Sequence, residues 1–191
     1  MTIKIALFCS GSGSNAENII RYFAGNNRIE FPLIVCNKST AFVHERAKIL
    51  NIPSVTFSKE EFAMGQPIIA KLKNFGITHI VLAGFLLKIA PIVIDAFPNR
   101  IINIHPALLP KFGGKGMYGM HVHEAVVAAC ESETGITIHY VNENYDEGNI
   151  IFQARCRITA SDSPVDVADK VHALEFEHFP KVIEAIWLKN L

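Results

Sequence analysis

Short apolar runs rich in isoleucine and valine alternate, along the first half of the chain, with segments whose apolar residues recur every three to four positions. The runs predict strands and the periodic segments predict helices. We expect strands near residues 3–9, 31–36, 53–57, 78–83 and 100–104. Uninterrupted apolar runs are typical of strands buried on both faces, so this α/β pattern predicts a doubly wound, mostly parallel sheet flanked by helices.

The last third of the chain follows a different pattern. Residues 136–141 and 150–158 form two strand-like runs joined by a turn-rich connection, which predicts an antiparallel hairpin. Ser163 followed by Pro164 is typical of a helix start. The long final helix predicted there carries an apolar stripe that would pack on the sheet, formed by Val167, Val171, Leu174, Phe179 and Ile183.

Residues typical of helix starts agree with the other predicted elements. Ser14 or Asn15 could cap the first helix, and Pro67 and Pro91 fit the first turns of two others. The chain has 191 residues, half of them apolar, and no repeat or linker interrupts it. This length suits one well-packed domain, so we expect residues 1–191 to form a single domain.

Composition narrows the classes of function. Eighteen basic and eighteen acidic residues cancel, so no overall positive field would gather tRNA or DNA, and we expect no nucleic-acid partner. The apolar run at residues 79–87 is far shorter than the roughly 20 residues that span a bilayer, so we expect no membrane segment. Four dispersed cysteines predict a cytoplasmic protein with reduced thiols and no zinc site: Cys9, Cys36, Cys130 and Cys156.

A glycine-rich loop at residues 9–15 joins the first strand to the first helix. Its backbone N–H groups and the positive helix end could receive an anionic phosphate. Residues 11–16 also fit a relaxed dinucleotide fingerprint, but Cys36, Asn37 and Lys38 end the second strand, where that site needs an acidic residue. A monophosphate fits better, although a tight turn that needs glycine only for backbone freedom explains the loop equally well.

Asn103 and His105 alternate on one strand that Pro106 ends. Their side chains therefore share a face at the carboxyl end of the strand, where open α/β sheets bind ligands. Asp146 lies in the connection of the predicted hairpin. Taken singly, each of the three also suits a local role, as a strand-end cap or a turn residue.

The sequence NIHPALLPKF, followed downstream by Tyr145-Asp146-Glu147-Gly148, resembles the signature of the folate-dependent formyltransferases, and the resemblance extends over nearly the whole chain. It implies transfer of a formyl group from 10-formyltetrahydrofolate, a co-substrate, to the amine of glycinamide ribonucleotide in purine synthesis. Asn103 and His105 would stabilise the tetrahedral intermediate. Asp146 would keep His105 charged and assist proton transfer.

The resemblance also implies binding roles for other residues. The ribonucleotide would be held by Gly13, Ser14, Asn15, Glu175 and His172, the last standing where the family has glutamine. The folate would contact Leu86, Leu87, Lys88, Ile89 and Asn103, although the family has a basic residue at the position of Leu87. His121 and His139 would lie near the reacting centre. Residues two apart on a helix diverge by about 200 degrees, so His121 and His123 predict no metal site.

Residues 112–119 contain four glycines and predict a mobile flap, longer than the corresponding loop of the family. A flexible surface excursion explains the same composition. Methionyl-tRNA formyltransferase and formyltetrahydrofolate hydrolase share the reacting motif, but each carries a further domain for which we expect no room here. A binding module without catalysis is the remaining alternative, and the presence of Asn103, His105 and Asp146 argues against it. The sequence does not predict an oligomeric state.

Overall fold

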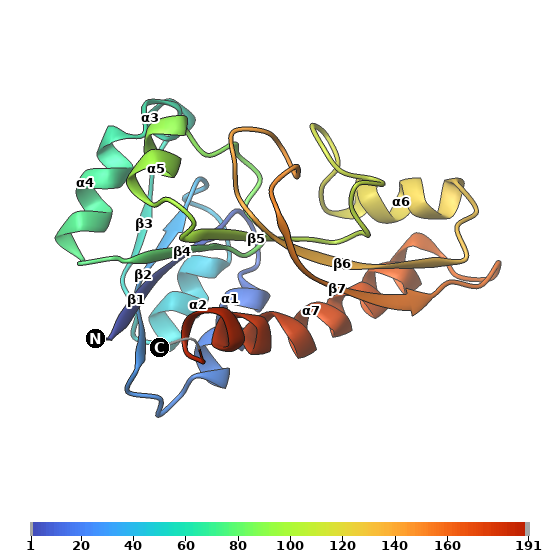
Figure 1. Ribbon diagram of the computed structural model, residues 1–191, viewed down its shortest axis with the longest axis horizontal. Coiled ribbons are helices and arrows are strands. Elements are labelled where there is room, and N and C mark those ends of the chain that lie inside the picture. The colour runs from blue at the N-terminus through green and yellow to red at the C-terminus, as the bar shows by residue number, and fades with distance from the viewer. Residues whose placement is uncertain (1, 190–191) are drawn as a thin grey trace.

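The computed structural model describes residues 2–189 and contains a seven-stranded sheet with helices on both faces (Figure 1). The strands are β1 Ile3–Cys9, β2 Ile29–Cys36, β3 Ser54–Thr56, β4 His79–Leu82, β5 Ile101–His105, β6 Glu133–Tyr140 and β7 Ile150–Arg157. The helices are α1 Ser14–Tyr22, α2 Val43–Ile49, α3 Lys59–Met64, α4 Gln66–Asn74, α5 Pro91–Ala96, α6 Met120–Ala128 and α7 Pro164–Trp187.

The strand order is β3-β2-β1-β4-β5-β6-β7. The first five strands are parallel, whereas β6 is antiparallel to both β5 and β7. The prediction of a doubly wound, mostly parallel sheet with a C-terminal antiparallel hairpin is confirmed. The chain leaves β1 for β2 on one side and returns to β4 on the other, which creates a switch point where such sheets bind ligands.

Both faces of the sheet are buried. Alternate side chains of β1 enter two separate cores: Ile5, Leu7 and Cys9 belong to one, and Ala6 and Phe8 to the other. The first core is completed by α1, α2, α6 and α7, and the second by α3, α4 and α5. This two-sided burial explains why the strands read as continuous apolar runs.

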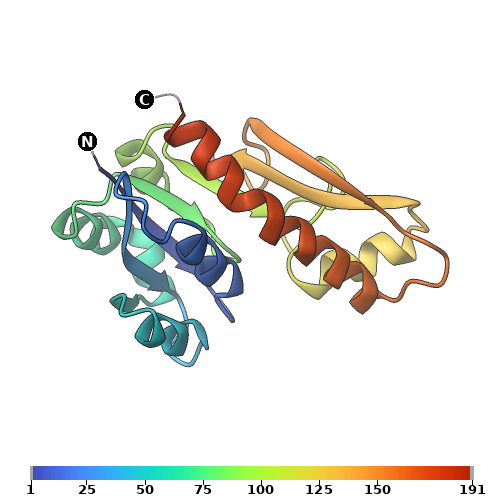
Figure 2. The ribbon, with the colours of Figure 1, turned by 90° about the horizontal axis from the view of Figure 1, so that it is seen from below.

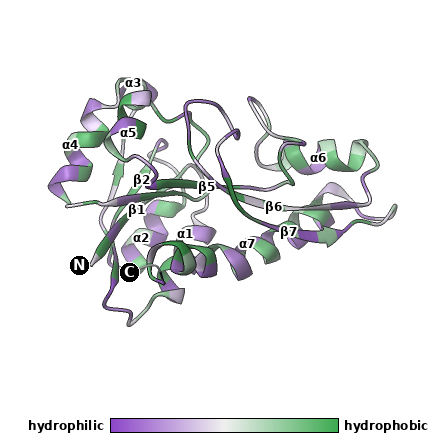
Figure 3. Cartoon of the chain, in the orientation of Figure 1, coloured by the Kyte–Doolittle hydropathy of each residue, from purple (hydrophilic) through white to green (hydrophobic). Residues whose placement is uncertain are grey.

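The final helix lies along the sheet for most of its length (Figure 2). Its cap is Ser163, whose hydroxyl accepts the N–H of Asp166 while the Asp166 carboxylate accepts the N–H of Ser163. Pro164 occupies the first turn, as Pro67 and Pro91 do in α4 and α5. Hydrophobic and hydrophilic stretches alternate along α7 (Figure 3), and its buried residues include Val167, Val171, Phe179 and Ile183. No helix within residues 2–189 is long and apolar enough to cross a membrane.

The predicted cap of the first helix is wrong. Neither Ser14 nor Asn15 caps α1; the position belongs to Gly13, whose φ of 74° is left-handed and which makes no side-chain cap. A Cβ on Gly13 would lie 2.4 Å from Cγ2 of Val43, so α2 approaches too closely for a side chain. Asn15 instead donates a hydrogen bond to Glu175 of α7 at 2.8 Å.

Candidate functional site

A cavity of about 450 Å³ opens at the carboxyl ends of the central strands. Its walls come from the glycine loop after β1, the segment after β4, the end of β5, the flap before α6, the β6–β7 connection and one face of α7. Among the residues that the sequence singled out, the cavity brings together Gly13, Ser14, Asn15, Leu86, Leu87, Lys88, Ile89, Asn103, His105, His139, Asp146, His172 and Glu175. The topology explains this gathering, because each wall follows the carboxyl end of a strand or packs against one.

Asn103 of β5 lies opposite His139 of β6 in the antiparallel register. The Nδ1–H of His139 donates to the Tyr140 carbonyl at 2.9 Å, which leaves Nε2 as the acceptor for the Asn103 amide at 3.1 Å. The same amide nitrogen lies 3.4 Å from Oδ1 of Asp146. His139 therefore fixes the direction of the Asn103 amide, and the contact with Asp146 is the looser of the two.

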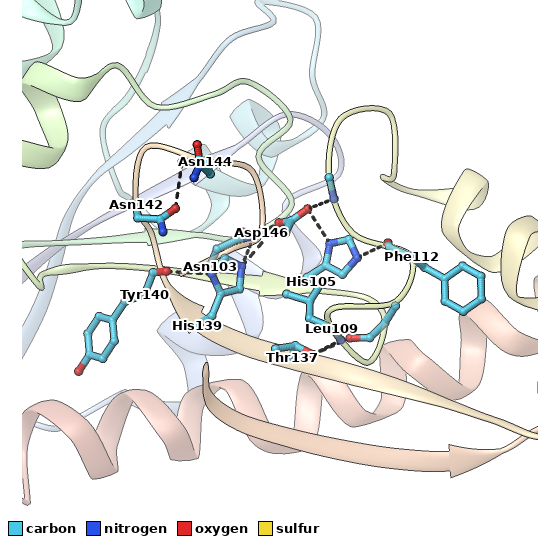
Figure 4. Close-up of polar contacts among 12 residues, drawn as sticks. Asn103, His105, Leu109, Phe112, Thr137, His139, Tyr140, Asn142, Asn144 and Asp146 are labelled. Atoms are coloured by element: carbon cyan, nitrogen blue, oxygen red, sulfur yellow. Dashed lines mark hydrogen bonds and ion pairs between the residues drawn. The ribbon is translucent and has the colours of Figure 1, made fainter. Parts of the chain in front are cut away.

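His105 is only 3% exposed. Its Nε2–H donates to the Phe112 carbonyl at 2.7 Å, while Nδ1 lies 3.5 Å from Oδ2 of Asp146 (Figure 4). A carbonyl can only accept, so the proton of the neutral ring belongs on Nε2. Nδ1 is then the nitrogen with a free lone pair, and it faces the carboxylate.

Asp146 joins these groups from the β6–β7 connection. Its Oδ2 accepts the N–H of Gly114 at 3.0 Å, and Oδ1 lies 3.6 Å from Nε2 of His139. Burial raises the pKa of Asp146, but the His139 ring, the His105 ring and the Gly114 N–H outweigh it and hold the pKa below the usual value. The carboxylate is therefore ionised at neutral pH.

The conformation of this connection depends on two backbone features. Asp146 has a left-handed φ of 56°, which aspartate tolerates better than most residues. Gly148 packs directly on β6, since a Cβ there would lie 1.6 Å from the Tyr140 carbonyl oxygen. The Asp-x-Gly pattern thus has a structural cause: the glycine seats the loop and the aspartate turns into the cavity.

The charge expected on His105 is not found. Burial lowers the pKa of His105 below its ordinary value, and this effect exceeds the opposing influence of Asp146 and of the Phe112 carbonyl. The neutral ring is therefore favoured near neutral pH. The family resemblance predicted a carboxylate beside the ring, but the sequence could not weigh that charge against the loss of solvent.

The opposite wall holds a second polar cluster. Oε2 of Glu175 accepts hydrogen bonds from Asn15 Nδ2 at 2.8 Å and from His172 Nδ1 at 3.0 Å. The hydrogen bond to Glu175 raises the pKa of His172, although burial opposes it. Within residues 2–189, the buried Oδ1 of Asn15 has no hydrogen-bond partner. A donor from a bound molecule could satisfy it.

The segment after β4 forms the remaining wall. The N–H of Leu86 donates to the hydroxyl of Ser10 at 2.9 Å, which links this segment to the end of β1. Ile89 is buried, Leu87 is half-buried, and Lys88 is exposed at the rim. Ser10 was missed in the sequence, because nothing in the pattern indicates that its hydroxyl reaches a residue 76 positions away.

The structure also contradicts the predicted position of one histidine. His121 does not lie near the centre: its side chain is 64% exposed, outside the cavity lining, and lies 3.4 Å from Glu124. His123 lines the cavity instead and is 6% exposed. Val122 and Val126 fix the buried face of α6, and that periodicity was the signal that could have identified His123.

The flap contributes backbone atoms to the site. The carbonyl of Phe112 and the N–H of Gly114 hold His105 and Asp146, and residues 114–119 line the cavity. The alternative of a simple surface excursion is therefore wrong, while the mobility of the flap stays a prediction. In the described part of the chain, no three His, Cys, Asp or Glu side chains form a group that could hold a metal ion.

Comparison with known proteins adds to this geometry. The model of the formyl transferase family matches residues 3–183. The chain is 40% identical to the chloroplastic phosphoribosylglycinamide formyltransferase of Arabidopsis thaliana, covering 96% of this chain and 65% of that protein. It is 37% identical to the phosphoribosylglycinamide formyltransferase of Bacillus subtilis, covering 96% and 94% of the two chains.

Solved structures agree with the relatives. The crystal structure of phosphoribosylglycinamide formyltransferase from Bacillus halodurans superposes with a TM-score of 0.89 at 35% identity, covering 98% of this chain and 97% of the other. Glycinamide ribonucleotide transformylase 1 of Geobacillus kaustophilus superposes with a TM-score of 0.88 at 34% identity, covering 97% and 98%. The shared fold therefore extends over nearly all of both chains.

Proposed function

This chain belongs to the formyl transferase family, and on that premise we propose that it transfers a formyl group from 10-formyltetrahydrofolate to the amine of glycinamide ribonucleotide in purine biosynthesis. The observation that carries the proposal is the gathering of Asn103, His105 and Asp146 in the cavity that also contains the glycine loop. Its relatives that are named phosphoribosylglycinamide formyltransferases support the choice of acceptor.

The glycine loop, with Gly13, Ser14 and Asn15, is the proposed phosphate site. Gly13 begins α1 without a side-chain cap, and the N–H of Ser14 makes only a long contact of 3.5 Å with the Ser12 hydroxyl, so the N–H groups of this first turn can turn to an anion. The carboxylate of Glu175, with His172 beside it, then suits the ribose hydroxyls. These two features arrange the ribonucleotide from the loop toward His105.

The folate is proposed to bind in the other half of the cavity. Leu86, Leu87 and Ile89 offer apolar surface, and the backbone of this segment offers hydrogen-bonding groups to a pterin. Lys88, exposed at the rim, suits the acidic tail of the folate. Asn103 stands between the two halves, at the end of β5, where the formyl group would meet the amine.

The protonation of His105 matches the chemistry. A ribonucleotide amine arrives largely as an ammonium ion, and the neutral Nδ1 can accept one of its protons. The free amine then attacks the formyl carbon, while the new imidazolium is stabilised by Asp146 at 3.5 Å. One proton transfer thus creates both the nucleophile and the cation that the tetrahedral oxygen requires.

Asn103 and His105 then stabilise the negative oxygen. The 3.4 Å contact between the Asn103 amide and Asp146 is long enough to be exchanged for a hydrogen bond to that oxygen. A carbon–nitrogen bond forms to the amine and the bond from the formyl carbon to the folate nitrogen breaks. The folate nitrogen gains a proton and the amine loses its second one, a transfer that Asp146 assists through water.

The test follows loss of 10-formyltetrahydrofolate by the purified protein, with and without glycinamide ribonucleotide, and repeats it with His105→Ala. We expect loss that depends on the ribonucleotide and falls sharply in the variant. Loss without the amine would identify a hydrolase instead. No loss in either case would contradict the proposed transfer and favour a binding module or another acceptor.

A further inference from the structure

One buried imidazole of the cavity has no role in the chemistry described so far. His123 of α6 is 6% exposed and lines the cavity, and its buried Nδ1 has no hydrogen-bond partner among residues 2–189. Leaving a buried polar atom unpaired is costly, and native proteins rarely do so. The unpaired nitrogen therefore points to a partner that the chain itself does not supply.

The position of His123 indicates which half of the cavity that partner occupies. Helix α6 packs against α7, which carries Glu175, on the face of the sheet opposite α5. Figure 2 shows the two helices side by side. The charges of Glu175 and His105 both influence the pKa of His123. The ring therefore lies within electrostatic reach of both the ribonucleotide wall and the reacting centre.

The chemistry of the ring narrows the partner further. Burial lowers the pKa of His123, so the ring is neutral near pH 7 and offers one N–H and one lone pair. Asn15, on the wall with Glu175, adds an unpaired carbonyl oxygen. The unpaired Nδ1 donates or accepts according to the tautomer of the ring, while the Asn15 oxygen needs a donor, and an amide group offers both a donor and an acceptor.

We propose that His123 hydrogen-bonds the amide of the glycinamide arm and thereby positions the amine for attack on the formyl carbon. The inference rests on the proposed function, since that function supplies the ribonucleotide. It assigns His123 to acceptor recognition and gives it no part in folate binding. A purely structural histidine, or one that binds only an internal water, would leave acceptor binding unchanged when replaced.

The experiment compares His123→Leu and His123→Gln with His121→Leu, a control on the same helix whose ring lies outside the cavity. KM is measured for each substrate, and binding of glycinamide ribonucleotide is measured by calorimetry. Loss of one hydrogen bond should weaken ribonucleotide binding about tenfold in His123→Leu. KM for 10-formyltetrahydrofolate should stay the same, His123→Gln should recover part of the loss, and the control should match the parent protein.

Unchanged ribonucleotide binding in a folded His123→Leu protein would overturn the inference, and so would an equal rise of both KM values. If His123→Leu does not fold, the same comparison is made with His123→Gln, and unchanged affinity there overturns it as well. The proposed function fails separately: a parent protein that binds the ribonucleotide but transfers no formyl group would contradict the activity, while the calorimetry would still decide the role of His123. A parent protein that does not bind the ribonucleotide would contradict both.

Discussion

Asp146 is the residue on which the reacting centre converges. Its two carboxylate oxygens lie within 3.6 Å of groups on β5, β6 and the flap, and three of these contacts, at 3.4, 3.5 and 3.6 Å, are long. Long contacts to one carboxylate can be exchanged for contacts to a substrate without breaking strong hydrogen bonds. Asp146 is therefore the more loosely bound neighbour of Asn103 and His105, whose shorter hydrogen bonds go to His139 and to the Phe112 carbonyl, and its contacts can be exchanged for contacts to a reacting oxygen.

Replacing Asp146 by asparagine should slow turnover far more than it weakens binding. Asparagine adopts the left-handed backbone as readily as aspartate, so the loop keeps its shape while the charge is lost. Without that charge the imidazolium form of His105 loses its partner, and we expect kcat to fall about 10²- to 10³-fold, the usual effect of a lost group at such a centre. Steady-state kinetics with both substrates measures this.

The same variant should change the pH dependence in a defined direction. Asp146 raises the pKa of His105 against the dominant effect of burial, so removing its charge lowers that pKa further. Protonation of free His105 prevents it from accepting the amine proton, which sets the acid limb of kcat/KM. In Asp146→Asn that limb should move to lower pH. A limb that stays in place or moves to higher pH contradicts the proposed proton transfer.

His172→Gln tests the charge beside the ribonucleotide. Because the pKa of His172 is raised by Glu175, the ring is charged below that pKa and loses its charge as the pH rises through it. The positive charge should favour the phosphorylated substrate by less than about 1 kcal/mol, as expected for a half-exposed ion pair. KM for glycinamide ribonucleotide should therefore rise up to about fivefold in the variant at pH 6 and little at pH 8.5. An equal effect at both pH values would show that charge is not the cause.

Single residues also mark the limit of sequence reasoning. Alternation on a strand was enough to place Asn103 and His105 on one face, because the pleat fixes side-chain direction locally. The hydrogen-bond partner of His105 could not be predicted in this way, because it is the backbone carbonyl of Phe112, which only the folded loop brings near. The pKa of His105 could not be predicted either, because it depends on how far the ring is removed from solvent. Neither is encoded in a local pattern. The choice of His121 over His123 was avoidable, because the apolar periodicity of α6 indicates which face of the helix is buried.

Among the elements, the β6–β7 hairpin contributes most to the arrangement of the reacting centre. Its register places His139 opposite Asn103, and its connection delivers Asp146. The hairpin was predictable from its two apolar runs and turn-rich link. Its approach to the Tyr140 carbonyl at Gly148 was not, because that contact depends on how the loop folds back over β6.

Gly148→Ala should misplace this connection. A Cβ 1.6 Å from the Tyr140 oxygen cannot be accommodated, so the loop must move and take Asp146 with it. The matched control is Gly135→Ala, where a Cβ would meet the Ala154 carbonyl at 1.8 Å in the same hairpin, away from the cavity. Both variants should lose stability in thermal unfolding. Per folded molecule, only Gly148→Ala should lose kcat, and equal kcat values for the two would contradict this role of the loop.

The first helix shows why helix starts were predicted unevenly. The Ser163 cap and the first-turn prolines depend on neighbours within four residues, and these predictions are confirmed. Gly13 is different, because Val43, thirty positions further along the chain, packs too close to its left-handed backbone to leave room for a side chain. Local preference favoured Ser14, and a tertiary contact overruled it.

In the whole molecule, one sheet separates two cores, and the cavity walls come from helices and loops attached to both. The four strands β1, β2, β4 and β5 contribute side chains to both cores, so neither core can be removed without exposing the other. We propose that residues 1–191 fold as one domain. The two substrates would bridge segments distributed along the chain, from the glycine loop to α7.

Thermal unfolding should therefore show a single transition, and each substrate should shift it. At a ligand concentration a hundred times Kd, binding adds about 2.7 kcal/mol to the free energy of unfolding, which corresponds to about 5 to 10 °C in Tm for a domain of this size. Calorimetry with and without each substrate measures this. Two separate transitions, only one of them moved by a given substrate, would contradict the single domain.

The flap reaches His105 and Asp146 through a carbonyl of Phe112 and an N–H of Gly114, and every residue type except proline carries both of these groups. The side chains of residues 115–118 do not form these contacts. The number of residues in the loop, however, fixes where the two backbone groups lie. Related proteins could therefore differ widely in the amino-acid sequence of the flap and still place the same backbone groups beside the histidine. A mutational scan should therefore tolerate most replacements at residues 115, 117 and 118 but few at Gly116, whose φ of 93° is left-handed, and deleting a single residue should disturb both contacts.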